Sequence, residues 1–145
     1  MTVGRICVRD VDLADIGDSA QVAAERMHSR NVGTLVVLNQ SKEPIGLITD
    51  RDLAVRVLAK AANPVGTRVG EVMTQTLRTV REDTPIEDAL RIMRAGPFRR
   101  LPVVDAKGKL VGLVSLDDVL SLLTEEFSDI GKLLQGEDPR SIAKS

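Results

Sequence analysis

The chain contains a long internal repeat, because a shift of 66 positions aligns residues 4–57 with residues 70–123 without a gap. Most other apolar positions match in character across the two copies. A gapless repeat of this extent predicts two copies of one structural unit, packed together so that each covers apolar surface of the other. The identical pairs include Gly4/Gly70, Ala23/Ala89, Met27/Met93, Leu35/Leu101, Gly46/Gly112 and Asp52/Asp118.

Each copy has the pattern of a βαββα unit, so we predict an α+β fold in which two such units form one module. Apolar residues at helical spacing follow a predicted helix start at Asp18 in one copy, and at Thr84 and Pro85 in the other. Two apolar runs separated by turn-forming residues then predict a hairpin in each copy. A second helix is expected to begin near Thr49 and near Ser115.

This reading divides the chain into a first repeat over residues 1–60, a linker over 61–69, a second repeat over 70–124 and a tail over 125–145. The tail carries Phe127, Ile130, Leu133 and Leu134 at helical spacing, which predicts an amphipathic helix before a polar end. Three positions for that helix remain open: on its own module, on a second copy, or on another protein.

Composition narrows the classes of partner. The net charge is −1, and the aromatic residues are Phe98 and Phe127, with no Trp or Tyr. Nucleic acid is therefore not expected as a partner, because single-stranded binders stack bases on aromatic side chains. No apolar run reaches the roughly 18 residues of a membrane span, and no signal-peptide pattern opens the chain, so we expect a cytoplasmic protein without membrane contact.

The motifs in each copy resemble those of the cystathionine-β-synthase (CBS) domain family. The segment 46–53 (GLITDRDL) and its counterpart 112–119 (GLVSLDDV) are similar to the end of a CBS domain, and 98–105 (FRRLPVVD) resembles its middle strand. The resemblance implies a tandem pair, a stand-alone Bateman module, with pseudo-twofold symmetry and two clefts between the repeats. It also implies adenosyl ligands such as AMP, ADP or ATP, a homodimer, and control of a client protein.

Two Thr/Ser-x-x-Asp motifs are the candidate ligand anchors within this framework. Asp52 and Asp118 can accept hydrogen bonds from a ribose diol, and Thr49 and Ser115 stand where a helix start favours phosphate. The same pattern also caps helices, and both roles remain open. Main-chain groups near Leu35 and Val37, and near Leu101, Pro102 and Val103, are the candidates for reading adenine.

Three arginines are candidates for holding a phosphate: Arg51, Arg99 and Arg100. Alternation along a strand predicts that Arg99 and Arg100 do not reach the same cleft. The first copy has Gly33 and Thr34 at the matching positions, so the two clefts are not expected to be equivalent.

The function predicted from these residues is a non-catalytic sensor of adenosine-type ligands that binds them between its two repeats. The alternative is a structural or interaction dimer with empty clefts. No catalytic constellation or metal-ligand cluster occurs in the sequence, so neither an enzyme nor an obligatory cofactor is expected. His28 is expected to be an exposed helix residue, and Cys7 a small apolar residue.

Overall fold

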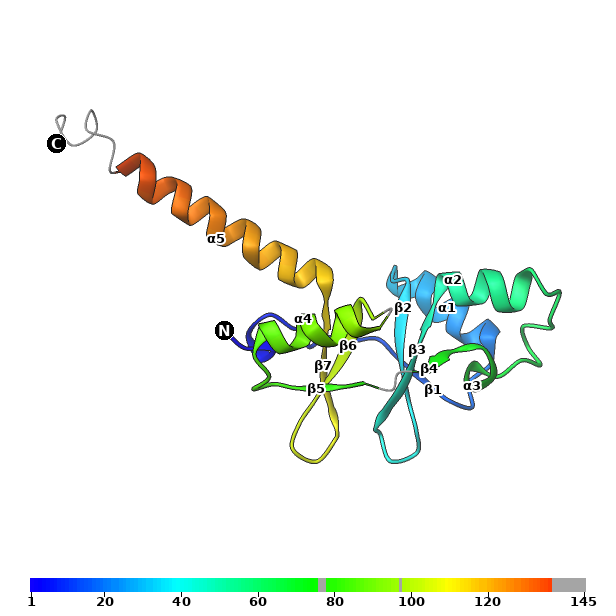
Figure 1. The fold of residues 1–145 in the computed structure, drawn as a ribbon. Helices are drawn as coiled ribbons and strands as arrows, with labels where there is room; N and C mark the ends of the chain where they lie inside the picture. Colours follow the sequence, from blue (N-terminus) through cyan, green and yellow to red (C-terminus); the bar gives the residue numbers. More distant parts are fainter. Residues whose placement is uncertain (76–77, 97, 137–145) are drawn as a thin grey trace.

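The computed structural model describes residues 1–75, 78–96 and 98–136, and it contains two small sheets side by side (Figure 1). Each repeat folds as strand, helix, hairpin and helix, which confirms the predicted α+β class. The first repeat comprises β1 (Leu13–Asp15), α1 (Ala20–Arg30), β2 (Thr34–Leu38), β3 (Pro44–Thr49), α2 (Asp50–Leu53) and the π-helical η2 (Ala54–Leu58). The second comprises β5 (Val80–Arg81), α4 (Ile86–Ala95), β6 (Arg100–Val104), β7 (Leu110–Ser115) and α5 (Leu116–Gly136).

The strand registers repeat with the same offset as the sequence. In one hairpin Leu35 pairs with Ile48, and in the other Leu101 pairs with Val114. The short first strand of each repeat lies parallel to the middle strand, so β2 and β6 are central strands. Central strands are buried on both faces here, which explains their uninterrupted runs of aliphatic residues.

The helix that follows the first strand of each repeat, α1 or α4, packs against its sheet through the face that the spacing predicts. The residues buried on α1 are Ala20, Ala23 and Met27, and those on α4 are Ile86, Ala89 and Met93. Two separate aliphatic cores result, one per sheet.

Both of these helices begin one residue later than predicted. The N-cap of α1 is Ser19, whose hydroxyl accepts a hydrogen bond from the Val22 amide at 3.1 Å. Asp18 instead accepts from the Asp15 amide and from Arg26. The predicted Thr84 cap is also wrong, because its hydroxyl accepts from the Arg81 amide and Pro85 occupies the N-cap position of α4.

The segment that opens each repeat packs on the sheet of the other repeat. The N-terminal segment, with the short η1 (Val3–Arg5), docks on the second sheet, where the Val3 amide donates to the Thr84 carbonyl at 2.9 Å. Residues 69–75 form α3 (Val69–Val72) and β4 (Thr74–Gln75), and β4 extends the first sheet beside β3. The two halves are therefore interlocked, since each core contains residues from the segment that precedes the other repeat.

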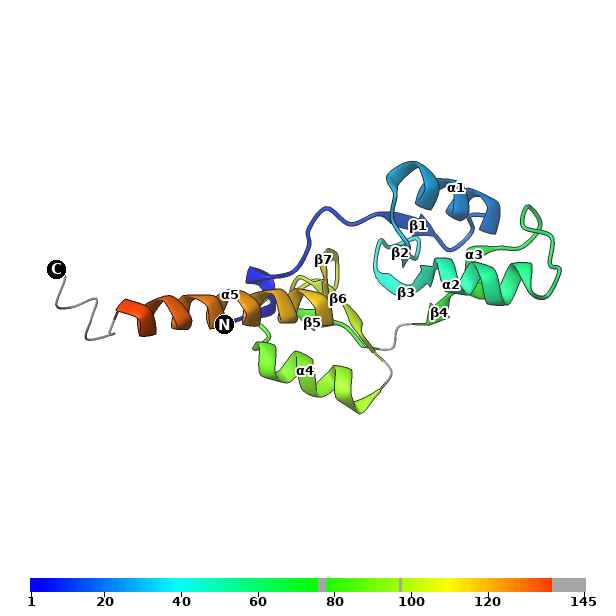
Figure 2. The same cartoon turned by 90° about the horizontal axis from the view of Figure 1, so that it is seen from above.

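The last helix, α5, is one continuous element of 21 residues. It crosses the predicted boundary at residue 125 and extends away from the two sheets (Figures 1 and 2), so a separate tail helix is not what forms. Phe127 is 71% exposed and Leu133 is 68% exposed, which rules out the first of the three positions, packing on its own module. Among the described residues, no helix has the length and apolar character to cross a membrane.

Candidate functional site

Two clefts lie at equivalent positions of the two repeats. We call the larger one, about 300 Å³, the Asp118 cleft, and the smaller one, about 200 Å³, the Thr49 cleft. Their residues correspond through the repeat: Ser115 to Thr49, Val8 to Thr74, and Thr34 to Arg100. The Asp118 cleft is lined by Val8, Asp10, Val11, Asp12, Val32, Gly33, Thr34, Arg100, Leu113, Ser115 and Asp118. The Thr49 cleft is lined by Leu47, Thr49, Thr74, Gln75, Phe98, Arg99 and Arg100.

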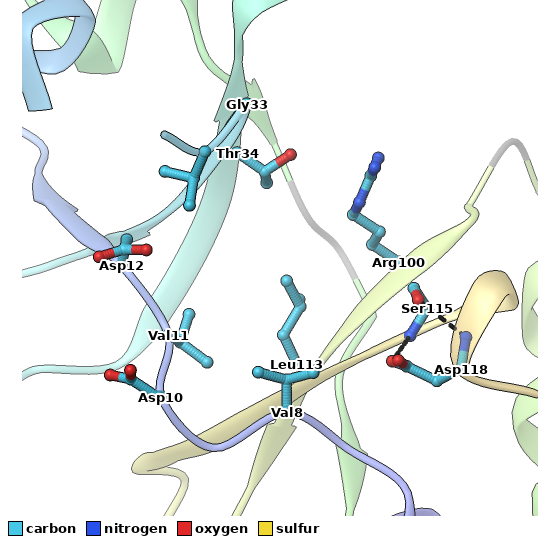
Figure 3. Close-up of a pocket in the computed structure, with 11 residues that line it drawn as sticks. Val8, Asp10, Val11, Asp12, Gly33, Thr34, Arg100, Leu113, Ser115 and Asp118 are labelled. Carbon is cyan, nitrogen blue, oxygen red and sulfur yellow. Dashed lines mark hydrogen bonds between the residues drawn. The ribbon is translucent and has the colours of Figure 1, made fainter. Parts of the chain in front are cut away.

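Asp118 and Ser115 form a reciprocal cap at the start of α5 (Figure 3). The Ser115 amide donates to Asp118 Oδ2 at 2.8 Å, and the Asp118 amide donates to the Ser115 hydroxyl at 3.1 Å. Within the described part of the chain, no hydrogen bond engages Asp118 Oδ1. This half-buried carboxylate therefore caps a helix with one oxygen and keeps acceptor capacity at the wall of the cleft.

Asp52 makes the same cap with Thr49, at 3.0 and 3.1 Å, but its carboxylate is engaged further. The Thr74 hydroxyl lies 3.2 Å from Oδ1 and 3.4 Å from Oδ2, and Arg56 Nε lies 4.0 Å from Oδ1. Asp52 is only 7% exposed and does not line the Thr49 cleft. Its acceptor sites are satisfied within the protein.

The difference between the two carboxylates follows from two positions of the repeat. Thr74 corresponds to Val8, which has no hydroxyl, and Arg56 corresponds to Leu122, which has no charge. Because the backbones pair alike, with Leu47 opposite Thr74 and Leu113 opposite Val8, the side chains alone make the difference. Asp118 therefore keeps acceptor capacity for a ligand in its cleft, whereas Asp52 uses the same capacity for contacts within the protein.

The predicted basic residues are distributed unevenly. Arg100 lines both clefts, and Arg99 lines the Thr49 cleft with it, so the expectation that they could not share a cleft is wrong. The reason is that β6 begins at Arg100, and Arg99 precedes the strand, where side-chain alternation does not apply. Arg51 is exposed and lies outside the lining of both clefts.

The strand residues proposed to read adenine are core residues. Leu35, Val37, Leu101 and Val103 are fully buried, and Pro102 is less than 2% exposed. Their side chains line neither cleft. A contact with a base would have to use their main chain, much of which pairs with strands on both sides.

The sequence analysis missed Asp10 and Asp12, which line the Asp118 cleft on the wall facing Asp118 (Figure 3). Asp12 accepts from Arg30 Nε at 2.8 Å, and Asp10 lies 3.8 Å from Arg30, so the charges on this wall are partly compensated. Arg100 extends from the opposite strand towards Thr34 (Figure 3). The cleft thus has a basic and hydroxylic end, carboxylates along its walls, and Val8 and Leu113 at its floor.

Cys7 and His28 stay outside both clefts. Burial raises the pKa of the Cys7 thiol, with Glu82 and Asp118 acting in the same direction, and its sulfur packs at the edge of the second core. His28 is exposed on α1, as expected. The described residues contain no group of three or more potential metal ligands.

The chain is similar to known proteins over most of its length. The family profile described as "CBS domain" matches residues 3–59 and 69–125. The uncharacterized protein MK0525 of Methanopyrus kandleri is 36% identical over 122 residues, which are 84% of this chain and 62% of that protein. The uncharacterized protein YlbB of Bacillus subtilis is 34% identical over 119 residues, 81% of this chain and 79% of that one.

A solved structure matches both the fold and the tandem arrangement. The structure of CBSX2 in complex with AMP superimposes with a TM-score of 0.71 at 30% identity, covering 86% of this chain and 96% of that one.

Proposed function

The chain belongs to the CBS-domain family, and we propose that it is a regulatory module that binds an adenosine nucleotide, such as AMP, ADP or ATP, in the Asp118 cleft. The observation that carries the proposal is the uncommitted Asp118 Oδ1 beside that cleft, with Arg100 and Thr34 across it. The AMP complex of the similar CBSX2 supports the class of ligand.

Each group in the cleft has a role that its chemistry suits. Asp118 accepts hydrogen bonds from the ribose hydroxyls, and bonds to a charged acceptor are the stronger kind. Arg100 and Ser115 hold the phosphate, with Thr34 adding a hydroxyl from the first repeat. Val8, Val32 and Leu113 supply apolar contact for the base. A volume of about 300 Å³ lies at the lower end of the range of small-ligand sites.

Thermal unfolding with AMP, ADP and ATP tests the proposal, because a ligand that binds only the folded state raises Tm. We expect the shift to be smaller with 2′-deoxy-AMP. Asp118→Asn keeps an oxygen for the helix cap but loses the charge, and should weaken binding about 10-fold or more. Asp117→Asn removes the same charge from the neighbouring exposed position and is the matched control.

Two results would overturn the nucleotide proposal. One is the absence of any Tm shift at millimolar concentrations of all three nucleotides. The other is equal binding by the Asp118→Asn and Asp117→Asn variants, since Asp118 would then not contact the ligand.

We further propose that the module catalyses no reaction, self-associates, and passes its ligand state to a client protein. The second candidate function is an interaction module with empty clefts, and the saturated Asp52 carboxylate favours it for the first repeat. Native mass spectrometry distinguishes the two, because it reports the oligomer and any retained nucleotide together. An oligomer without nucleotide at saturating AMP supports the second candidate.

A further inference from the structure

The Thr49 cleft lacks the carboxylate that the other cleft offers to a ribose. Asp52 does not line it, and the Thr74 hydroxyl and the Thr49 amide already donate to the Asp52 carboxylate. The cleft holds about 200 Å³, less than the roughly 300 Å³ at which sites for small organic ligands begin. A nucleoside would therefore find neither a carboxylate for its hydroxyls nor the usual volume in this cleft.

The two clefts also carry opposite charge. The described lining of the Thr49 cleft contains the guanidinium groups of Arg99 and Arg100 and no carboxylate. The Asp118 cleft has Arg100 as its basic residue and is lined by three carboxylates, those of Asp10, Asp12 and Asp118. The charge behind the wall of the Thr49 cleft is compensated, because Arg56 Nε lies 4.0 Å from Asp52 Oδ1. The Thr49 cleft is therefore the electropositive one of the two.

The two guanidinium groups have no other role within the described residues. The ion pairs found there involve other arginines: Arg9, Arg26, Arg30, Arg56, Arg81 and Arg91. The backbones of Arg99 and Arg100 are nevertheless fixed, since the Leu116 amide donates to the Arg99 carbonyl at 2.8 Å and Arg100 pairs with Ser115. Two like charges at the border of one hollow repel each other, and a bound anion would relieve that repulsion.

The first repeat adds uncharged donors from the opposite side of the cleft. The Thr49 hydroxyl accepts from the Asp52 amide at 3.1 Å, which leaves its own hydrogen to donate. Gln75, on β4, adds a side-chain amide that can donate. A phosphate oxygen accepts from all of these groups, and the planar arginine fork binds two such oxygens at once.

We propose that the Thr49 cleft binds a phosphate-class anion without a ribose, such as inorganic phosphate or pyrophosphate, between Arg99, Arg100 and the Thr49 hydroxyl. The site is independent of the nucleotide proposed for the other cleft, because Asp118 takes no part in it. The same phosphate chemistry could also come from the phosphates of a nucleotide whose ribose is held at Asp118. A variant of Asp118 distinguishes these two sources.

The test is isothermal titration of the full-length protein with pyrophosphate at constant ionic strength, so that general screening does not change. We expect saturable binding that Arg99→Gln weakens about 10-fold or more, because it removes a charged donor that lines the Thr49 cleft but not the Asp118 cleft. Arg51→Gln is the matched control, since it removes the same charge from an exposed residue outside both clefts. The Asp118→Asn variant should bind pyrophosphate as the wild type does.

Amide chemical shifts locate the anion. The signals of Thr49 and Gln75 should move on addition of pyrophosphate, whereas those of Asp10 and Val11 in the other cleft should not. The Tm without ligand should be the same in all variants with an exposed arginine replaced, which separates a loss of binding from a loss of folding.

Three results would overturn this assignment. The first is the absence of saturable binding at millimolar pyrophosphate. The second is an equal loss in Arg99→Gln and Arg51→Gln, because the anion would then respond to the overall charge and not to the cleft. The third is a loss in Asp118→Asn, which would place the phosphate in the Asp118 cleft.

Discussion

The equivalent carboxylates Asp52 and Asp118 differ in two neighbours, and the Thr74 hydroxyl beside Asp52 is the one that donates a hydrogen bond at 3.2 Å. Thr74 donates to Asp52, while its counterpart Val8 cannot donate to Asp118. We therefore expect Val8→Thr to give Asp118 an internal donor and to weaken AMP binding about 10-fold, since the nucleotide must then displace a hydrogen bond. Isothermal titration measures the change.

A matched control for this prediction is Val11→Thr, which adds the same hydroxyl elsewhere in the cleft. Equal affinities for Val8→Thr and wild-type protein would contradict the explanation. The reciprocal change, Thr74→Val, should destabilise the fold by about 1 kcal/mol, because it removes a hydrogen bond from a buried carboxylate.

The corresponding glycines Gly46 and Gly112 are required because the opening segment of the other repeat passes close to each of them. A Cβ at Gly46 would lie 2.7 Å from the Thr74 carbonyl oxygen, and one at Gly112 would lie 2.8 Å from that of Val8. Both contacts are with backbone, which cannot move aside as a flexible side chain can. Gly46→Ala and Gly112→Ala should each cost about 1–3 kcal/mol in urea unfolding.

Gly17→Ala is the control for these substitutions, because nothing lies within 4 Å of a Cβ at that position. It should change the free energy of unfolding by less than about 0.5 kcal/mol. If all three variants were equally stable, the close approach would not be what requires glycine at Gly46 and Gly112.

The roles of Asp52 and Asp118 could be predicted from the sequence only as a pair of alternatives. A Thr/Ser-x-x-Asp motif uses the same carboxylate to cap a helix and to hold a ligand, so the pattern cannot distinguish them. The distinction depends chiefly on the hydroxyl of Thr74, for which the other repeat has Val8, and both residues are remote in sequence from the aspartates beside them. The two roles can be told apart only once it is known that the opening segment of each repeat packs on the sheet of the other.

At the scale of elements, periodicity predicted the strands and the buried faces of α1 and α4, because these elements bury a face against a core. It placed the helix starts one residue early, since Asp18 and Ser19 are both acceptable caps and the choice depends on local contacts. It also divided α5 in two. The buried Val119 of α5 packs on the body, whereas Phe127 and Leu134 further along are exposed, and this change resembles a boundary in sequence.

The exposed half of α5 depends on intrinsic helix propensity, because it has no tertiary packing within the described chain. Gly131 lies in this half and lowers that propensity by roughly 1 kcal/mol relative to alanine. Nothing lies within 4 Å of a Cβ added there. Gly131→Ala should therefore increase the helical signal at 222 nm and stabilise α5 by about 0.5–1 kcal/mol.

Gly136→Ala provides the comparison, since Gly136 ends the same helix and a Cβ there also meets nothing within 4 Å. Its effect should be smaller because helix ends fray. Equal helical signals for the Gly131→Ala variant and the wild type would mean that α5 is already held by packing, as in a tight coiled coil.

At the scale of the whole molecule, the two repeats form one unit because the opening segment of each packs on the sheet of the other. The segment before each repeat supplies a fully buried valine to the opposite core: Val3 to the second and Val69 to the first. The Arg9 guanidinium, 2.6 Å from Glu82, joins the N-terminal segment to the second half at the surface. Neither repeat has a complete core without the chain of the other.

This interlocking predicts cooperative unfolding. Val3→Ala and Val69→Ala each remove two methyl groups from a buried site and should each cost about 1–3 kcal/mol. Because each segment connects the two cores, both variants should lower one common transition, by about 2–4 °C per kcal/mol for a chain of this size. The exposed Val65→Ala, at 65% exposure in the wild type, should leave Tm unchanged.

Scanning calorimetry of the three variants is the measurement, because a calorimetric enthalpy equal to the van't Hoff enthalpy indicates a single cooperative unit. If Val3→Ala split the transition, with the second half melting first, the repeats would be independent domains that merely touch. A single transition in all three would instead mean that ligand binding at Asp118 stabilises both halves together. A nucleotide bound at Asp118 would then also stabilise the first repeat against unfolding. It would do so although the Asp52 carboxylate of that repeat already accepts hydrogen bonds from the protein itself.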